Sequence, residues 1–194
     1  GMVPLELDAW DCDFYGASCH KWLLAPKGVG FAYVAERHAA GMEPPLLGFP
    51  LSASSDASRF EVPGVCDWTH AGALETALDF QLRIGWESRI RPYCLALARY
   101  LKDKLVEEIP KARLTVPVDV EMSGFIVSFH IEGVDAQKVC NHLWETYRIE
   151  VVYTPAYGLS CFRVSTHFYA AFADLDRFLE ALVAVSQRPE MQLE

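Results

Sequence analysis

The chain has 194 residues, of which 52% are hydrophobic and 22% charged, so it can bury a sizeable core as one large domain or two small ones. Its formal net charge of −9 at pH 7 argues against nucleic acid or a membrane surface as a partner, because both attract clustered Lys and Arg. No bilayer-spanning run, signal-peptide pattern, disulfide framework or metal-binding spacing is visible, so we expect a cytoplasmic protein with reduced cysteines and no metal.

Two short strands are expected at Asp13–Ser18 and Gly30–Val34, on either side of a segment that contains Lys21. A stretch rich in Pro, Gly and Ser follows from Gly41 to Pro63 and is typical of loops.

Helical periodicity begins at Ala71 and places Leu74, Leu78 and Leu82 on one face. A second helix is expected after Trp86. It should stop near Pro110, and its predicted buried stripe consists of Ile90, Cys94, Leu97, Leu101 and Leu105.

The rest of the chain alternates strands and helices. Residues 125–131 alternate as in a half-buried strand, 135–147 read as a helix with Val139 and Leu143 inward, and further strands are expected at 150–153 and 161–166. A last helix opens near Asp174 and should bury Leu175, Phe178, Leu179, Leu182 and Val183. The sequence thus predicts one core that contains Phe125, Val127, Phe129, Val164, Leu179 and Leu182.

This order of elements predicts an α/β fold in two parts, divided within the long helix near Pro92. Residues 1–92 are expected to belong to a larger α/β domain and residues 93–194 to form a small α+β domain.

Lys21 stands out because it follows a run of small residues and His20 and precedes an apolar strand. A lysine that performs covalent chemistry must lose its proton, and its usual covalent role is a Schiff base with a carbonyl such as that of pyridoxal phosphate (PLP). Ser18 and His20, two residues apart in an extended segment, can point to one side as phosphate donors. Periodicity alone leaves open the alternative of a solvated lysine at a strand end.

The segment "DFYGASCHKWLLAPKGVGFAYV" resembles the lysine segment of the class V aminotransferases, which are fold-type-I PLP enzymes. The family pattern is an Asp-led strand, a Ser-x-His-Lys-Trp core, a Pro-x-Gly-x-Gly turn and an apolar strand. The matching residues are Asp13, Ser18, His20, Lys21, Trp22, Pro26, Gly28 and Gly30. Two further segments, Arg59–Phe80 and Phe162–Ala170, also resemble the family, so the likeness covers essentially the whole chain.

The resemblance implies roles for individual residues. Lys21 would hold PLP as a Schiff base, Ser18 and His20 would bind its phosphate, and Arg163 would bind the carboxylate of an amino-acid substrate. Gly64 and Val65 stand where the family has a Gly-Thr pair that reaches the phosphate of a neighbouring subunit, which implies a homodimer. Val65 has no hydroxyl, so only backbone N–H groups could remain there.

Arg163 also merits attention without the family. In an extended segment, Phe162 and Val164 face one way and Cys161, Arg163 and Ser165 the other. A planar guanidinium suits recognition of a carboxylate, although an arginine there could also be a solvated charge at a strand edge. Cys161 reads better as a small buried strand residue than as a nucleophile.

The chain resembles the C-terminal half of these enzymes. The expected phosphate loop, the group that stacks on the pyridine ring and the aspartate that pairs with the ring nitrogen would lie upstream. We therefore expect this chain alone to bind PLP weakly or not at all and to self-associate as a dimer or higher oligomer.

The predicted function is that of a PLP-dependent class V enzyme, or a fragment of one, nearest to the isopenicillin-N-epimerase-like members. One alternative is a catalytically silent fragment that lacks half of the PLP site. A further alternative is a cysteine desulfurase. Such an enzyme needs a nucleophilic cysteine on a loop before the strand that carries the substrate-binding arginine, and residues 148–160 contain no cysteine.

Overall fold

The structure is a computed structural model that describes residues 1–43, 57–61, 65, 67–119, 121–156 and 158–193. It divides into two compact units, Gly1–Trp86 and Glu87–Glu194. The predicted assignment of residues 1–92 to a larger PLP-binding domain and of residues 93–194 to a small domain stays a prediction. The predicted loop between residues 41 and 63 falls largely outside the described residues.

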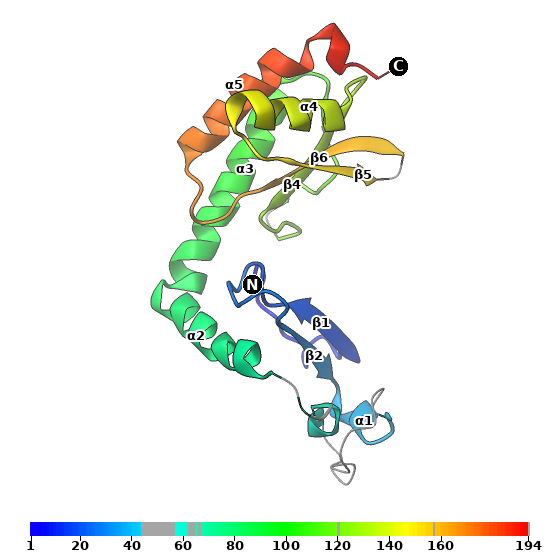
Figure 1. Cartoon of the computed structure of the whole chain (residues 1–194), viewed down its shortest axis with the longest axis vertical. Coiled ribbons are helices and arrows are strands. Elements are labelled where there is room, and N and C mark those ends of the chain that lie inside the picture. Colours follow the sequence, from blue (N-terminus) through cyan, green and yellow to red (C-terminus); the bar gives the residue numbers. More distant parts are fainter. Residues whose placement is uncertain (44–56, 62–64, 66, 120, 157, 194) are drawn as a thin grey trace. The chain divides into compact units, whose positions relative to one another are not determined.

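The first unit is built on a β-hairpin (Figure 1). β1 (Phe14–Ser18) pairs antiparallel with β2 (Gly30–Val34), and Ser18 lies opposite Gly30. Gly30 is required there, because a Cβ atom would come within 2.8 Å of the carbonyl oxygen of Ala17. The short helix α1 (Glu36–Ala39) follows β2, and α2 (Thr69–Arg83) is the long helix of this unit.

The helix α2 packs on the connection between the two strands. Its Ala77 forms a small core with Cys19, Ala25 and Val29, and the side-chain amide of Gln81 donates to the carbonyl oxygen of Trp22 at 3.2 Å. Leu78 and Leu82 are 43% and 77% exposed. Of the predicted leucine stripe, Leu74 packs against this core, whereas Leu78 and Leu82 do not.

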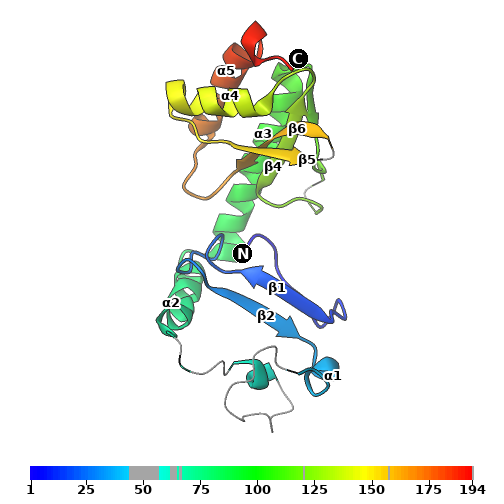
Figure 2. The same ribbon diagram turned by 45° about the vertical axis from the view of Figure 1, so that its right-hand side comes forward.

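The second unit is a four-stranded antiparallel sheet covered on one face by helices (Figures 1 and 2). The strand order is β3 (Ala112–Leu114), β4 (Ile126–Ile131), β6 (Leu159–Ser165) and β5 (Val152–Ala156). The covering helices are α3 (Arg91–Glu108), α4 (Ala136–His142) and α5 (Phe172–Ser186). A π-helical turn, Trp86–Ile90, precedes α3, and another, Leu143–Tyr147, extends α4.

Local sequence explains where these helices begin and end. Pro92 stands in the first turn of α3, where its missing N–H costs nothing. The carboxylate of Asp135 caps α4 by accepting from the N–H groups of Gln137 and Lys138. The turn after α4 ends at Arg148, whose φ of 55° is left-handed.

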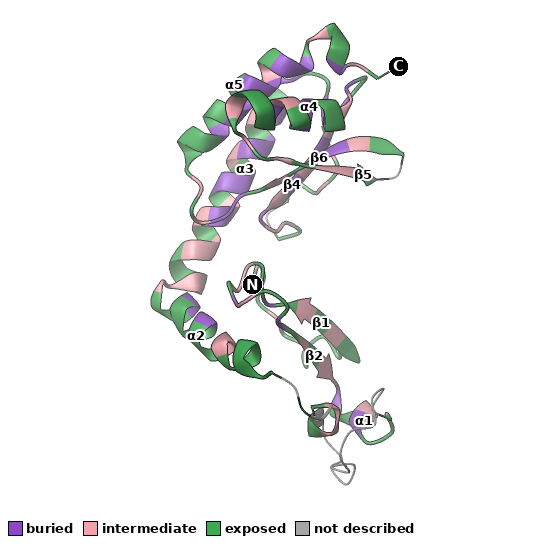
Figure 3. Ribbon diagram, viewed as in Figure 1, coloured by how far each residue is buried: buried purple, intermediate pink, exposed green. Residues whose placement is uncertain are grey.

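The core of this unit lies between the sheet and the helices. Phe129 and Phe162 are both fully buried and stack with ring centroids 4.9 Å apart. Figure 3 shows buried residues concentrated along α3, α5 and the strands beneath them. The predicted core is confirmed for Val127, Phe129, Leu179 and Leu182; Val164 packs against this cluster, and Phe125 is buried outside it.

The strands differ from their prediction in two places. No strand is predicted at Ala112–Leu114, where the structure has β3. The strand expected at 150–153 runs from Val152 to Ala156 and includes Pro155. Pro155 lacks a backbone N–H, but β5 is the edge strand of the sheet, where a missing donor is tolerated.

Candidate functional site

The lysine segment begins where β1 ends. Cys19 is fully buried, and its N–H donates to the carbonyl oxygen of Val29 at 2.9 Å, which extends the hairpin by one residue. Ser18, His20 and Lys21 are exposed on either side of it. A buried anchor thus holds three polar side chains at the surface within four consecutive residues.

A tight turn presents Lys21. The N–H of Leu24 donates to the carbonyl oxygen of Lys21 at 3.2 Å, and Leu24 has a φ of 62°. The N–H of Ala25 then returns to the carbonyl oxygen of Cys19 at 3.1 Å. Among the described residues, the amine of Lys21 has no hydrogen-bond or ion-pair partner.

The imidazole of His20 has a defined orientation. Its Nδ1 lies 3.1 Å from the carbonyl oxygen of Val29, and a carbonyl can only accept, so Nδ1 carries the hydrogen. Nε2 is left as an acceptor in the neutral ring and becomes a donor only in the protonated ring. His20 can therefore donate to a phosphate through Nε2 only when it is protonated.

The segment expected to reach a second subunit is described in part. Gly64 lies outside the described residues, and Val65 is fully exposed. Asp67 accepts from the N–H of Thr69 at 2.8 Å at the start of α2, and hydrogen bonds from Thr69 lower the pKa of its carboxyl. Asp67 thus helps to start a helix, as an Asx turn does.

Arg163 lies on β6, on the face of the sheet opposite the helices. Its cross-strand neighbours are Ser128 on β4 and Val152 on β5. Its side chain is exposed, and within the described part of the chain it makes no hydrogen bond or ion pair. This arrangement leaves both edges of the guanidinium available to a ligand.

Thr166 fixes the end of β6 and is a residue that the sequence pattern does not reveal. Its fully buried hydroxyl lies 3.0 Å from the carbonyl oxygen of Phe125 and 3.2 Å from that of Cys94, and its N–H donates to the Phe125 oxygen at 2.8 Å. It follows β6 directly, three residues after Arg163, and joins the end of that strand to α3 and to the residue that precedes β4. A polar residue directly after the Arg-x-Ser strand is the only signal of this role in the sequence.

Cys161 behaves as a structural residue. It is fully buried, and burial raises the pKa of its thiol. Because the thiolate is the nucleophilic form, a buried neutral thiol is poorly suited to attack a substrate. The other described cysteines are buried except Cys12, which is partly exposed.

The donors at the start of the chain fit a phosphorylated aldehyde such as PLP. An unpaired amine can form an imine, and a hydroxyl and a ring nitrogen beside it can bind phosphate oxygens. Ser18, His20 and Lys21 are all exposed within four consecutive residues of the first unit. Arg163 belongs to the second unit, so its relation to Lys21 stays a prediction.

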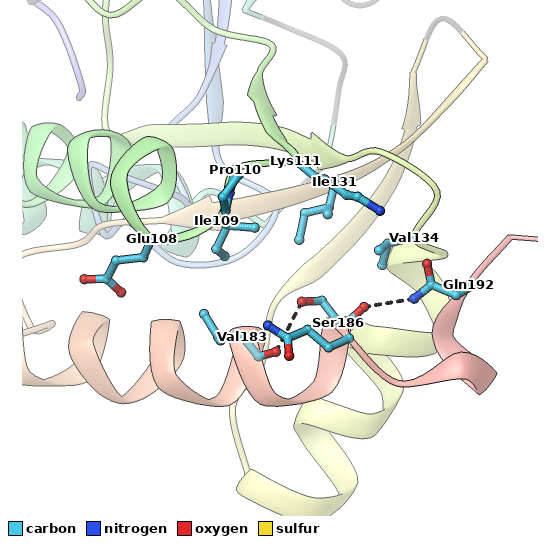
Figure 4. Close-up of a pocket in the computed structure, with 10 residues that line it drawn as sticks. Glu108, Ile109, Pro110, Lys111, Ile131, Val134, Val183, Ser186 and Gln192 are labelled. Carbon is cyan, nitrogen blue, oxygen red and sulfur yellow. Dashed lines mark hydrogen bonds between the residues drawn. The ribbon is translucent and has the colours of Figure 1, made fainter.

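The second unit also contains a cavity of about 400 Å³ near the carboxyl ends of α3 and α5 (Figure 4). Its polar groups are largely engaged: Glu108 pairs with Lys104 at 3.1 Å, and the amide of Gln192 donates to the carbonyl oxygen of Ser186 at 2.9 Å. It contains none of the predicted site residues. Its walls are otherwise mainly aliphatic, and we assign it no ligand.

No group of three or more His, Cys, Asp or Glu side chains among the described residues could hold a metal ion. No described helix is both long enough and apolar enough to cross a bilayer.

Known protein sequences resemble the chain along most of its length. Isopenicillin N epimerase from Amycolatopsis lactamdurans is 32% identical over an alignment 205 positions long, which spans 96% of this chain and 50% of that protein. A probable cysteine desulfurase from Synechocystis is 28% identical, covering 93% of this chain and 46% of that protein. The chain spans about half the length of the curated relatives that it matches.

Solved structures show the same fold. The apo cysteine desulfurase of Thermococcus onnurineus matches 93% of this chain and 48% of its own, with a TM-score of 0.79 and 23% identity. A variant of C-DES with glycine covalently linked to its PLP cofactor matches with a TM-score of 0.78 and 19% identity. The predicted fold, part of a fold-type-I PLP-dependent transferase, is confirmed.

The family model described as aminotransferase class-V matches residues 1–178, which include the lysine segment and Arg163. The chain therefore belongs to the class-V aminotransferase family.

Proposed function

We propose that this chain is a PLP-dependent enzyme of the class V type, or part of one, that acts on an amino acid through a Schiff base at Lys21. The observation that supports this most directly is the exposed set of Ser18, His20 and Lys21 around buried Cys19. The identity of 32% to one isopenicillin N epimerase and 31% to another supports the isopenicillin-N-epimerase-like members as the proposed subfamily.

Each residue has a defined task in this proposal. PLP, when bound, supplies an electron sink that stabilises negative charge at the substrate α-carbon. Lys21 provides the amine that holds the cofactor, while the hydroxyl of Ser18 and protonated Nε2 of His20 bind its phosphate. Backbone N–H groups of Gly64 and Val65 would bind the phosphate from a neighbouring subunit. Arg163 orients the substrate through its carboxylate.

The assembly follows from these tasks. We propose a cytoplasmic homodimer in which residues 1–92 belong to the PLP-binding domain and residues 93–194 to the small domain. Because the chain spans about half of its curated relatives, the remaining contacts to the cofactor would come from another polypeptide segment. We therefore expect the 194-residue chain alone to bind PLP weakly.

Reductive trapping tests the role of Lys21. The chain is titrated with PLP, reduced with borohydride and mapped by mass spectrometry, with Lys27→Ala as a matched control because Lys27 is an exposed lysine of the same turn. We expect weak, saturable labelling at Lys21 that Lys21→Ala abolishes and Lys27→Ala preserves. Labelling spread evenly over exposed lysines would contradict the proposal, and tight stoichiometric labelling of Lys21 would contradict the expected weakness.

A second candidate is a catalytically silent fragment, and the half-length match to the curated relatives favours it. Co-expression with a polypeptide equivalent to the rest of those relatives separates the two. An active class V enzyme should then give a PLP absorbance band that depends on Lys21, and Arg163→Ala should keep the band but weaken amino-acid binding. A silent fragment should give neither.

A cysteine desulfurase is the third candidate, since several relatives carry that name. Such an enzyme needs an accessible nucleophilic thiol, and Cys161 is buried with a raised pKa. Conversion of cysteine to alanine by the completed assembly, with sulfide released when a thiol reductant is added, would support this candidate over the epimerase-like one if a Cys161→Ala variant loses the activity.

A further inference from the structure

The face of the sheet opposite the helices has an ordered row of side chains across its two central strands and one edge strand. Ser128 on β4, Arg163 on β6 and Val152 on β5 are direct cross-strand partners. Side chains of directly paired residues project from the same face with Cβ atoms about 5 Å apart. The three side chains therefore form one continuous strip with the guanidinium in the middle.

The polar members of this strip have no hydrogen-bond partner among the described residues. In the described part of the chain, neither the hydroxyl of half-buried Ser128 nor the guanidinium of Arg163 takes part in a hydrogen bond. His130, the next residue of β4 on this face, has a buried Nδ1 atom without a partner among the described residues. Buried polar atoms are nearly always satisfied, so the open Nδ1 atom of His130 indicates that this face accommodates a further polar group beside Ser128 and Arg163.

The backbone beneath the strip is fixed on both sides. Val127 and Phe129, which flank Ser128, are fully buried, and Phe162, which precedes Arg163, stacks on Phe129. The hydroxyl of Thr166 ties the end of β6 to β4 and α3. Ser128 and Arg163 are thus held in register before any ligand arrives, which lowers the ordering cost of binding.

We propose that Ser128 and Arg163 together bind one carboxylate, and that Val152 contacts an apolar substituent next to it. The guanidinium fork meets the two carboxylate oxygens, and the Ser128 hydroxyl donates to one of them from the β4 side. Val152, 42% exposed on the β5 side, offers an aliphatic surface. The ligand class is a small carboxylate with an apolar chain.

This inference rests on the proposed role of Arg163 in binding the substrate carboxylate and extends it to two further residues. Ser128 becomes a second contact to the anion. Val152 becomes a residue that selects among substrates by their side chain. Neither assignment requires Lys21 or a bound cofactor.

The test uses the full 194-residue chain without PLP and the probe 3-methylbutanoate, followed by NMR through the side-chain Nε–Hε signal of Arg163. We expect saturable binding by the wild-type chain, weakened about tenfold in Ser128→Ala, the low end for a hydrogen bond to a charged group. Thr115→Ala is the matched control, because Thr115 N–H donates to the Ser128 carbonyl oxygen from the β3 side, away from Arg163. That variant should bind like the wild type.

A second comparison tests Val152. The wild-type chain should prefer 3-methylbutanoate to acetate, and Val152→Thr, which keeps the branched shape but replaces a methyl group with a hydroxyl, should reduce the preference for 3-methylbutanoate. Backbone NMR spectra establish that each variant is folded. Absence of saturable binding by the wild type, or equal affinities of wild type and Ser128→Ala, would overturn the inference.

The two proposals fail separately. If Lys21 is not labelled by PLP but 3-methylbutanoate binds as described, the carboxylate site stands and the cofactor proposal falls. If Lys21 is labelled and Ser128→Ala changes nothing, the cofactor proposal stands and the role of Ser128 falls.

Discussion

Raising the pH from 8 to 10 should destabilise the second unit through two buried thiols. Cys94 is fully buried and Cys140 is 6% exposed, and burial raises their pKa values from 9.0 to about 11 and about 12. Both thiols remain protonated in the folded chain at pH 10, whereas in the unfolded chain they ionise above pH 9. Unfolding then releases protons, so stability falls as the pH rises through this range.

The magnitude follows from the linkage of proton binding to unfolding. Each thiol whose unfolded pKa is 9.0 and whose folded pKa is 11 or higher should lower the free energy of unfolding by about 1.3 kcal/mol between pH 8 and pH 10. The two together should contribute about 2.6 kcal/mol. Urea unfolding followed by circular dichroism, with a reductant present, measures this difference.

The double variant Cys94→Ala/Cys140→Ala isolates the two thiols. Its loss of packing lowers stability equally at both pH values, and other groups that titrate in this range, such as Lys102 and Tyr100, are common to both proteins. The loss of stability from pH 8 to pH 10 should therefore be about 2.6 kcal/mol smaller in the variant. Equal losses in the two proteins would refute the reasoning.

Three further predictions concern stability. Thr166→Val should lower the free energy of unfolding by about 1 kcal/mol in urea, because valine lacks the hydroxyl that bonds to the carbonyl oxygens of Phe125 and Cys94, while the Phe125 oxygen keeps the N–H of residue 166 as a donor; no change would show that these bonds contribute nothing. Phe129→Ala should cost about 3–5 kcal/mol in a guanidinium titration because it empties the centre of the core, and a cost below 1 kcal/mol would contradict this packing. Asp13→Asn should reduce the decrease in melting temperature that the protein shows as the pH falls below about 4. Hydrogen bonds from His38 and Arg37 lower the pKa of Asp13, so the carboxylate stabilises the folded chain above about pH 4 and this stabilisation is lost as the pH falls further. The same decrease in melting temperature in the wild type and the variant would contradict the prediction.

Much of the fold can be predicted from local patterns. The alternation at residues 125–131 identifies which side of β4 is buried, because side chains in a strand point to opposite faces in turn. The stripe from Cys94 to Leu105 identifies the buried face of α3 for the corresponding reason in a helix. Both patterns were sufficient because one face of each element is wholly covered within the second unit.

Other features depend on the neighbours of an element. The stripe of Leu74, Leu78 and Leu82 has helical spacing, yet only Leu74 packs against the core of the first unit, where Ala77 and Gln81 also make contacts. Helical periodicity shows that one face of a helix is more apolar than the other, but it does not identify what each face contacts. Pro155 disfavours the prediction of a strand, because proline has no backbone N–H to donate. The strand order resolves this, since β5 is an edge strand.

The candidate site divides in the same way. Ser18, His20 and Lys21 are within four residues of one another, so their grouping is visible in the sequence. The pairing of Ser128 with Arg163 joins residues that are far apart along the chain, and it emerges only from the register of β4 and β6. The role of Thr166 likewise depends on carbonyl groups of two other elements.

The strand order of the second unit has a consequence for how this unit folds. β5 and β6 are joined by two residues, whereas β4 and β6 are separated by 27 residues that include α4 and β5. Closing the longer loop costs about 2 kcal/mol more in chain entropy than closing the shorter one. We therefore expect the β5–β6 hairpin to form early and β4 to join it late, so substitutions in β4 should mainly speed unfolding and substitutions in the hairpin should mainly slow folding.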